Sequence, residues 1–187
     1  LIGEVKKFVK VFLYAPTWRD TEVDFIEMSG LDLQAVNDWL ASVNSCMLVK
    51  LHPYTKIDLS DLKCGKFSNI KLVDQMVDLN PLLYYADVLI TDYSSVYFDF
   101  LLMDRPVIYF SFDIEDYIEK CRDLYEPYES FTPGIKVTTC HELIQAMKTV
   151  DDDGFSSERH ELRRLIWGSY SGEASKSLAS WATSLNS

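Results

Sequence analysis

Glycine and proline are scarce in this chain of 187 residues, with 7 and 6 copies. Together with a hydrophobic content of 48%, this scarcity excludes collagen-like sequence, low-complexity linkers and a disordered chain. Basic residues are also few, because 18 Lys and Arg stand against 29 Asp and Glu and give a net charge of −11. A negative net charge disfavours a protein that binds mainly to the phosphates of nucleic acid or lipid. We therefore expect a packed fold that binds no nucleic acid.

The usual patterns of metal sites and membrane spans are missing too. The four cysteines form no C-x-x-C pair and the three histidines no H-E-x-x-H motif, so no metal site is predicted. The longest apolar stretch, Val96 to Met103, is broken by Asp99 and is far shorter than the roughly 20 residues of a membrane span. We expect no secretory signal, because the first residues show no basic start followed by an apolar run. Because the cysteines are scattered, we expect them to be reduced thiols, and we therefore expect a cytoplasmic protein.

Short apolar runs do alternate with helical patterns along the whole chain. The predicted strands cover residues 8–14, 46–51, 70–73, 88–91, 107–110 and 135–138. The predicted helices cover residues 32–42, 81–85, 95–103, 114–121, 141–150, 157–166 and 173–184. Such alternation is typical of parallel strands joined by crossover helices. We predict one α/β domain over residues 1–187, with a Rossmann-like doubly wound parallel sheet.

Ligands of such sheets bind at the carboxyl ends of the strands, where helix N-termini and free backbone N–H groups meet. The turns after four of the predicted strands hold most of the reactive polar side chains. These candidates are Thr17, Arg19, His52, Asp92, Ser94, Ser95, Thr138 and Thr139. Because parallel strands end at one edge, we expect these turns to lie there together.

Two adjacent hydroxyls follow the strand that ends in Asp92. Ser94 and Ser95 stand where the next helix is expected to begin, and capping of its free N–H groups is one role for them. A pair of hydroxyls at the positive end of a helix dipole is also typical of a phosphate site. We expect contact with phosphate here.

Asp99 is the only charge between Ser95 and Met103, in a helix that is otherwise apolar. Since an unpaired buried carboxylate costs several kcal/mol, we expect it to have a partner. The spacing of four residues places it on the same helical face as Ser95. Its partner is either local backbone or a lysine, or else a hydroxyl of the ligand.

His52 leaves its predicted strand just before Pro53, which restrains the backbone there. Most single histidines are structural, but the near-neutral pKa typical of this side chain suits proton transfer or pairing with phosphate. Lys50 lies on the same side of the strand, although a lysine at a sheet edge is as often solvated.

The turn after the first strand contributes Thr17 and Arg19. Arg19 is either a forked donor for phosphate, with the Thr17 hydroxyl beside it, or half of a solvated pair with Asp20. The aromatic side chains of Trp18 and Tyr93 either stack on a nucleobase or simply pack.

Three segments together resemble the CDP-glycerol glycerophosphotransferase family, the teichoic-acid and capsule polymerases and primases of bacteria. They run from Leu13 to Asp20, from Val49 to Pro53 and from Leu89 to Phe100. The likeness continues through Asp104 to Tyr109 and through Gly172 to Ser175, in the order of the family.

The resemblance implies a GT-B architecture of two Rossmann-like halves, of which this chain is the C-terminal, nucleotide-binding half. Its start at Leu1, without an initiator Met, fits a piece of a longer protein that is inactive without its N-terminal half. The expected reaction moves glycerol phosphate or ribitol phosphate from a CDP-linked donor to a polyol-phosphate or lipid-linked acceptor and releases CMP. The donor is a substrate, and no cofactor is expected. Such proteins work at the inner face of the plasma membrane.

The resemblance also suggests roles for the candidate residues. By this likeness, His52 acts at the transferred phosphate, Ser94 and Ser95 hold the donor phosphates, and Asp99 orients a hydroxyl as a second catalytic residue. Thr17 and Arg19 would lie near the donor, and the remaining candidates Asp92, Thr138 and Thr139 would bind substrate. Two alternatives stay open: a GT-B glycosyltransferase or sugar-nucleotide epimerase that uses a UDP- or CMP-sugar, and a catalytically silent module that binds a partner.

Overall fold

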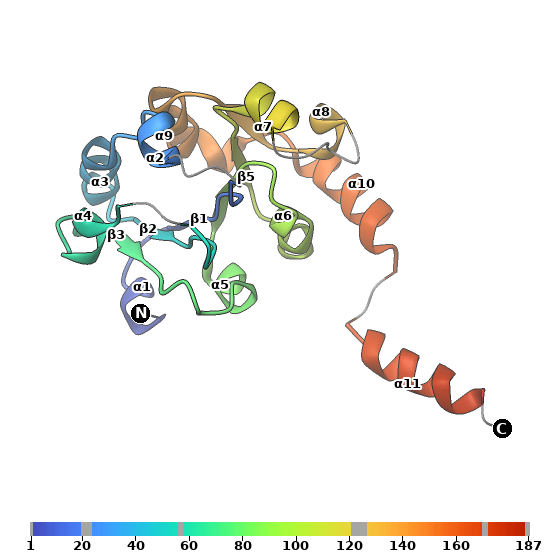
Figure 1. Ribbon diagram of the computed structural model, residues 1–187. Coiled ribbons are helices and arrows are strands. Elements are labelled where there is room, and N and C mark those ends of the chain that lie inside the picture. The colour runs from blue at the N-terminus through green and yellow to red at the C-terminus, as the bar shows by residue number, and fades with distance from the viewer. Residues whose placement is uncertain (1, 20–23, 56–57, 121–126, 170–171, 186–187) are drawn as a thin grey trace.

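The computed structural model describes residues 2–19, 24–55, 58–120, 127–169 and 172–185. One parallel sheet is built from the strands β1 (Val11–Tyr14), β2 (Cys46–Val49), β3 (Ile70–Leu72), β4 (Val88–Thr91), β5 (Val107–Phe110) and β6 (Ile135–Val137). Their order is β3-β2-β1-β4-β5-β6, which is the order of a doubly wound nucleotide-binding sheet. Of these strands, Figure 1 labels β3, β2, β1 and β5. The α/β prediction is therefore confirmed.

Helices connect the strands and extend the chain beyond β6. They are α1 (Ile2–Val5), α2 (Phe25–Met28), α3 (Leu33–Ser42), α4 (Ser60–Lys63), α5 (Asn80–Tyr85), α6 (Val96–Phe100), α7 (Ile114–Lys120), α8 (Tyr128–Phe131), α9 (Cys140–Thr149), α10 (Ser156–Trp167) and α11 (Ala174–Ser184), with 3₁₀ turns η1 (Leu101–Met103) and η2 (Val150–Asp152). Every predicted helix is present, and the one expected over 95–103 is α6 continued by η1. The predicted end of α7 at Cys121 lies outside the described residues.

Both faces of the sheet are buried, as the continuous apolar strands require. On one face, Phe12 and Tyr14 belong to a cluster that includes residues of α3 and α9. On the other, Val11 and Leu13 belong to a cluster that includes residues of α5, α6 and α10. The sheet is therefore held between helical layers, and its carboxyl edge is left to the loops.

The strand order reverses between β1 and β4, which pair side by side in parallel. At such a point the loops of two adjacent strands run to opposite sides, and a crevice opens between them. The turns after β1, β2 and β4 are consequently neighbours. None of the helices in the described ranges has both the length and the apolar character needed to cross a bilayer.

Candidate functional site

A cavity of about 490 Å³ lies at the carboxyl edge of the sheet. The ends of β1, β2, β3 and β4 contribute to its wall, together with one side chain of α7. The described lining residues are Ala15, Pro16, Thr17, Trp18, Lys50, Leu51, His52, Pro53, Gln75, Met76, Val77, Leu79, Ser94 and Tyr117. Three predicted site residues from three separate turns, Thr17, His52 and Ser94, are therefore brought to one cavity.

His52 is exposed at this cavity, and its ring has aromatic neighbours. It stacks on Trp18, with ring centroids 5.7 Å apart, and meets Tyr54 edge-on at 5.2 Å. The backbone N–H of Tyr54 donates to Nδ1 of His52 over 3.2 Å. Because Nδ1 accepts a hydrogen bond, the neutral ring carries its proton on Nε2. Nε2 is thus the nitrogen that remains for a ligand.

Ser94 and Ser95 behave differently from one another. Ser94 lines the cavity, and its hydroxyl lies 3.4 Å from the backbone nitrogen of Val96. Ser95 is the residue before α6, is exposed and makes no capping bond with its side chain. The structure therefore brings only the first of the two hydroxyls to the cavity of His52, and the phosphate role of Ser95 stays a prediction.

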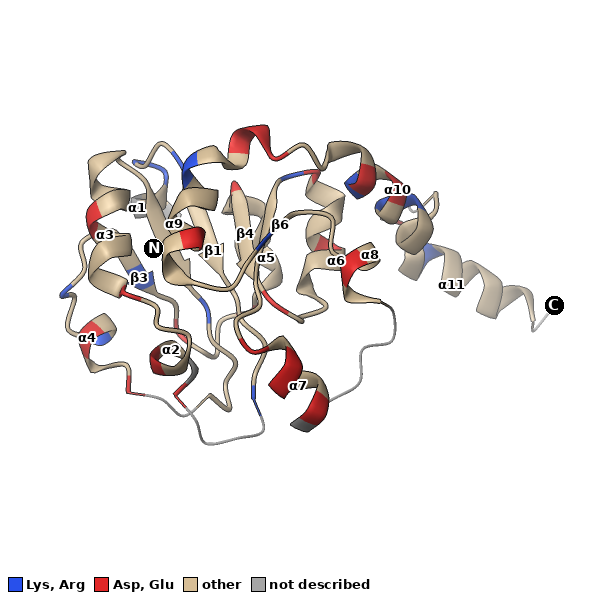
Figure 2. Ribbon diagram, turned by 90° about the horizontal axis from the view of Figure 1, so that it is seen from above, with Lys and Arg blue, Asp and Glu red and all other residues tan. Residues whose placement is uncertain are grey.

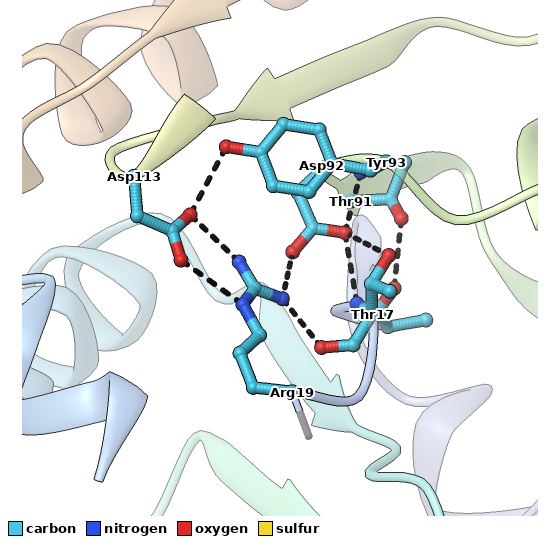
Figure 3. Close-up of polar contacts among 7 residues, drawn as sticks. Thr17, Arg19, Thr91, Asp92, Tyr93 and Asp113 are labelled. Atoms are coloured by element: carbon cyan, nitrogen blue, oxygen red, sulfur yellow. Dashed lines mark hydrogen bonds and ion pairs between the residues drawn. The ribbon is translucent and has the colours of Figure 1, made fainter. Parts of the chain in front are cut away.

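Behind the cavity, Asp92 holds the turn that follows β1 (Figure 3). Its Oδ1 accepts hydrogen bonds from the backbone N–H and the hydroxyl of Thr17, at 2.8 and 2.6 Å, and from the backbone N–H of Tyr93. The neighbouring Thr91 hydroxyl donates to the carbonyl of Ala15 over 2.8 Å. Asp92 itself is only 1% exposed. The structure therefore gives this predicted substrate-binding carboxylate a role in shaping the turn.

Arg19 completes this network, and neither of the two roles considered from the sequence describes it. Its guanidinium pairs with Oδ2 of Asp92 at 2.6 Å and binds Asp113 through two hydrogen bonds of 2.8 and 3.0 Å (Figure 3). It also donates to the carbonyl of Thr17. The expected solvated pair with Asp20 lies outside the described residues, but the Arg19 side chain is buried, so a solvated role is wrong.

Aromatic rings enclose the same guanidinium. Its central carbon lies 5.4 to 5.6 Å from the ring centres of Tyr93, Phe112 and Tyr117. Burial alone disfavours the charged form, but the adjacent carboxylates of Asp92 and Asp113 outweigh it and raise the pKa of Arg19. Tyr93 also donates its hydroxyl to Asp113 over 3.0 Å, and burial raises its pKa. Arg19 is therefore a fixed, charged part of the scaffold.

The expectation that Asp99 is buried is wrong. Asp99 is exposed on α6 and is not among the described residues that line the cavity. Partial desolvation raises the pKa of its carboxyl group. Ser95, four residues earlier, is exposed as well, so the helical face that the two residues were expected to share points to solvent. Catalysis by Asp99 stays a prediction that this placement does not support.

Thr138 and Thr139 cap α9 and do not line the cavity of His52. The Thr139 hydroxyl accepts from the backbone N–H of Glu142 over 3.2 Å, and the Glu142 carboxylate accepts from both threonine N–H groups and from the Thr138 hydroxyl. These bonds lower the pKa of Glu142. Thr138 lines a second, smaller cavity with Ser111. Substrate binding by these threonines stays a prediction, beside the capping role that the structure gives them.

Two further side chains at this edge of the sheet were not among the predicted site residues. Asp113 was missed, although it follows β5 closely and reading past that strand as well would have found it. Lys50 was left open between a side chain that faces the same way as His52 and a solvated edge residue; it is 6% exposed and lines the cavity, so it is not solvated. Within the described ranges, no group of three or more metal-ligating side chains is placed to hold an ion.

Known proteins share this sequence and this fold. The chain is 34% identical over 149 residues to the teichoic acid ribitol-phosphate polymerase TarL of Staphylococcus aureus, a match that covers 78% of the chain and 26% of TarL. It is 31% identical over 182 residues to the teichoic acid glycerol-phosphate primase of Bacillus subtilis, covering 94% of the chain and 44% of the primase. The chain thus spans between about a quarter and just under half of the length of these relatives.

A solved structure agrees with the sequence relatives. The wall teichoic acid polymerase TagF matches with a TM-score of 0.76 and 26% identity, over 96% of this chain and 45% of TagF. A variant of TagF has also been solved after a soak with CDPG. The family model described as CDP-Glycerol:Poly(glycerophosphate) glycerophosphotransferase matches residues 4–179, nearly the whole chain. The resemblance read from the three strand-end turns is confirmed, and the chain belongs to this glycerophosphotransferase family.

Proposed function

We propose that this chain is the donor-binding part of an enzyme that transfers a polyol phosphate from a CDP-linked donor to an acceptor hydroxyl and releases CMP. The observation that carries the proposal is the meeting of His52, Ser94 and Thr17 at one cavity on the carboxyl edge of the sheet. Family membership supports the same chemistry and favours it over a sugar-nucleotide enzyme or a silent module. The CDPG soak of TagF supports a CDP-linked donor.

The proposed reaction is an in-line displacement at the β-phosphorus of the donor. The acceptor oxygen forms a new bond to this phosphorus, the bond to the bridging oxygen breaks, and CMP leaves with the electron pair. The acceptor hydroxyl loses its proton to a base. Since such transfers need little covalent help from the protein, the task of the site is positioning and neutralisation of charge.

The hydrogen bonding of His52 decides its part in this reaction. Nδ1 already accepts the Tyr54 N–H, so the neutral ring offers a donor at Nε2 and no free lone pair. His52 is therefore suited to donate a hydrogen bond to the transferred phosphoryl group. The base that takes the acceptor proton would come from elsewhere in the enzyme.

The proposed enzyme needs a second half besides this chain. The chain covers 45% of TagF, the share expected of one half of a two-domain GT-B protein. We expect this chain alone to bind the donor weakly and to turn over little or none, because the acceptor half is needed to complete the site. The acceptor would be a polyol-phosphate chain or a lipid-linked sugar, met at the inner face of the plasma membrane.

Calorimetry of the chain with CDP-glycerol, CDP-ribitol, CMP and UDP-N-acetylglucosamine tests the proposal. We expect a CDP-linked polyol to bind at least about tenfold more tightly than the UDP-sugar. Replacing His52 by Asn should weaken donor binding by about tenfold, the loss expected for one hydrogen bond to a charged group. His141→Asn, at an exposed histidine of α9, is the matched control and should bind as the parent chain does. Equal affinity for all four ligands would overturn the assignment.

A further inference from the structure

Lys50 is a buried lysine that forms no ion pair with a carboxylate of the described residues. It follows β2 directly, two residues before His52, and its side chain reaches the same cavity. Only 6% of the residue is exposed. None of the ion pairs among the described residues involves Lys50, whereas the buried guanidinium of Arg19 pairs with both Asp92 and Asp113.

The hydrogen bonds of Lys50 leave capacity for a ligand. Its ammonium donates to the carbonyl of Leu51 over 3.1 Å and to the carbonyl of Gln75 over 2.8 Å. An ammonium group carries three N–H donors, so one remains. Both partners are neutral, so the positive charge itself is not balanced by them. A buried charge without a counter-ion is costly, and proteins keep such charges mainly where a ligand supplies the balance.

The charge pattern of the cavity indicates which ligand that is. Lys50 is the only Lys or Arg among the described lining residues, and none of those residues is Asp or Glu. The chain as a whole is strongly acidic, with a net charge of −11, and Asp and Glu residues lie on many elements, α7 among them (Figure 2). The cavity is therefore a local positive site in a negative protein, which suits an anion bound by short-range contact.

We propose that Lys50 binds the diphosphate of the donor and supplies the positive charge that neutralises it. The inference rests on the proposed function, because it names the group that holds the donor at the same cavity. Lys50 and His52 both project from the end of β2, so the two side chains are placed to contact adjacent phosphates. Lys50 thus takes the phosphate-binding role that the sequence suggested for Arg19.

The electrostatic surroundings of Lys50 are consistent with an anion site. Burial lowers the pKa of Lys50, and the electrostatic effect of the Asp74 and Asp78 carboxylates opposes this only in part. A bound anion would favour the ammonium form again. Lys50 also has a structural role, because its bond to Gln75 holds the loop that follows β3. The test has to separate these two roles.

The experiment compares the binding of CDP-glycerol, inorganic pyrophosphate and cytidine to the parent chain, Lys50→Gln and Lys50→Met. We expect both variants to bind CDP-glycerol and pyrophosphate about 10- to 100-fold more weakly, the range for a lost charge-assisted hydrogen bond, and to bind cytidine as before. Lys148→Gln removes the same charge from an exposed position near the end of α9 and should change nothing. Lys50→Met retains the apolar stem, and thermal unfolding verifies that each variant is folded.

The outcomes separate the inference from the function it rests on. If the variants bind CDP-glycerol as the parent chain does, or lose cytidine and CDP-glycerol by the same factor, Lys50 is structural and the inference fails while the proposed function stands. If pyrophosphate binding depends on Lys50 but CDP-glycerol is not preferred over UDP-N-acetylglucosamine, Lys50 is an anion site and the proposed function fails.

Discussion

Arg19 joins three segments at the carboxyl edge of the sheet: its own turn, the end of β4 and the loop after β5. Its side chain is 3% exposed and pairs with Asp92 and Asp113. Removing one member of a buried charge network leaves the others uncompensated, at a typical cost of about 3–5 kcal/mol. We therefore expect Arg19→Met to lower the free energy of unfolding by about that amount, as measured by urea denaturation.

A matched control makes this prediction specific. Arg164→Met removes the same charge from an exposed position on α10 and should change the unfolding free energy by less than about 0.5 kcal/mol. If Arg19→Met kept the stability of the parent chain and lost affinity for CDP-glycerol, Arg19 would be a ligand-binding residue after all, as the forked-donor interpretation holds.

Residues at strand ends could be found in the sequence because parallel strands finish at one edge. That rule located Thr17, His52 and Ser94, which do share a cavity. Which side chains form ion pairs is harder to predict, because nothing in the sequence indicates that Arg19 binds Asp113, which lies far along the chain. Asp99 was misjudged for a related reason: spacing along a helix shows which residues share a face, but not whether another element covers that face.

At the scale of elements, the strands and longer helices were predictable because their apolar residues repeat over several turns or fill whole strands. α3 and α9, for example, present buried positions at helical spacing. The helices α1, α2, α4 and α8 were not predicted. Each has four residues, too short for a period of 3.6 to be recognised. They depend on tertiary packing, which local sequence does not display.

The approach of β6 to β5 depends on Gly134. A Cβ at this position would lie 2.2 Å from the carbonyl oxygen of Val107 and 2.9 Å from the ring of Tyr109. Because this carbonyl belongs to the backbone of β5, inside the sheet, it cannot easily move away. We therefore expect Gly134→Ala to destabilise the fold by about 1–3 kcal/mol, the usual range for overpacking, in thermal unfolding. Gly3→Ala, where nothing lies within 4 Å, is the control, and equal effects of both substitutions would contradict the prediction.

The whole molecule consists of a packed α/β body and a helix that lies apart from it (Figure 1). Every residue of α11 is exposed, including the large apolar side chains of Leu178 and Trp181. By contrast, α10 buries Leu162, and its Trp167 donates to the carbonyl of Phe98 over 2.8 Å. Since most helical stability in proteins comes from tertiary packing, the two helices should contribute very differently to the stability of the fold.

Two truncations test this difference. Removing residues 170–187 should leave the melting temperature within about 2 °C, because 1 kcal/mol corresponds to about 2–4 °C in a chain of this size and α11 buries no side chain. Removing residues 156–187 also deletes α10 and exposes the apolar surface that Leu162 covers, so the melting temperature should fall by clearly more. Scanning calorimetry of both chains checks the pair. A fall of 5 °C or more (about 1.3–2.5 kcal/mol) in the shorter truncation would mean that α11 packs on the body in solution, because a helix exposed on all sides has no tertiary contacts to lose.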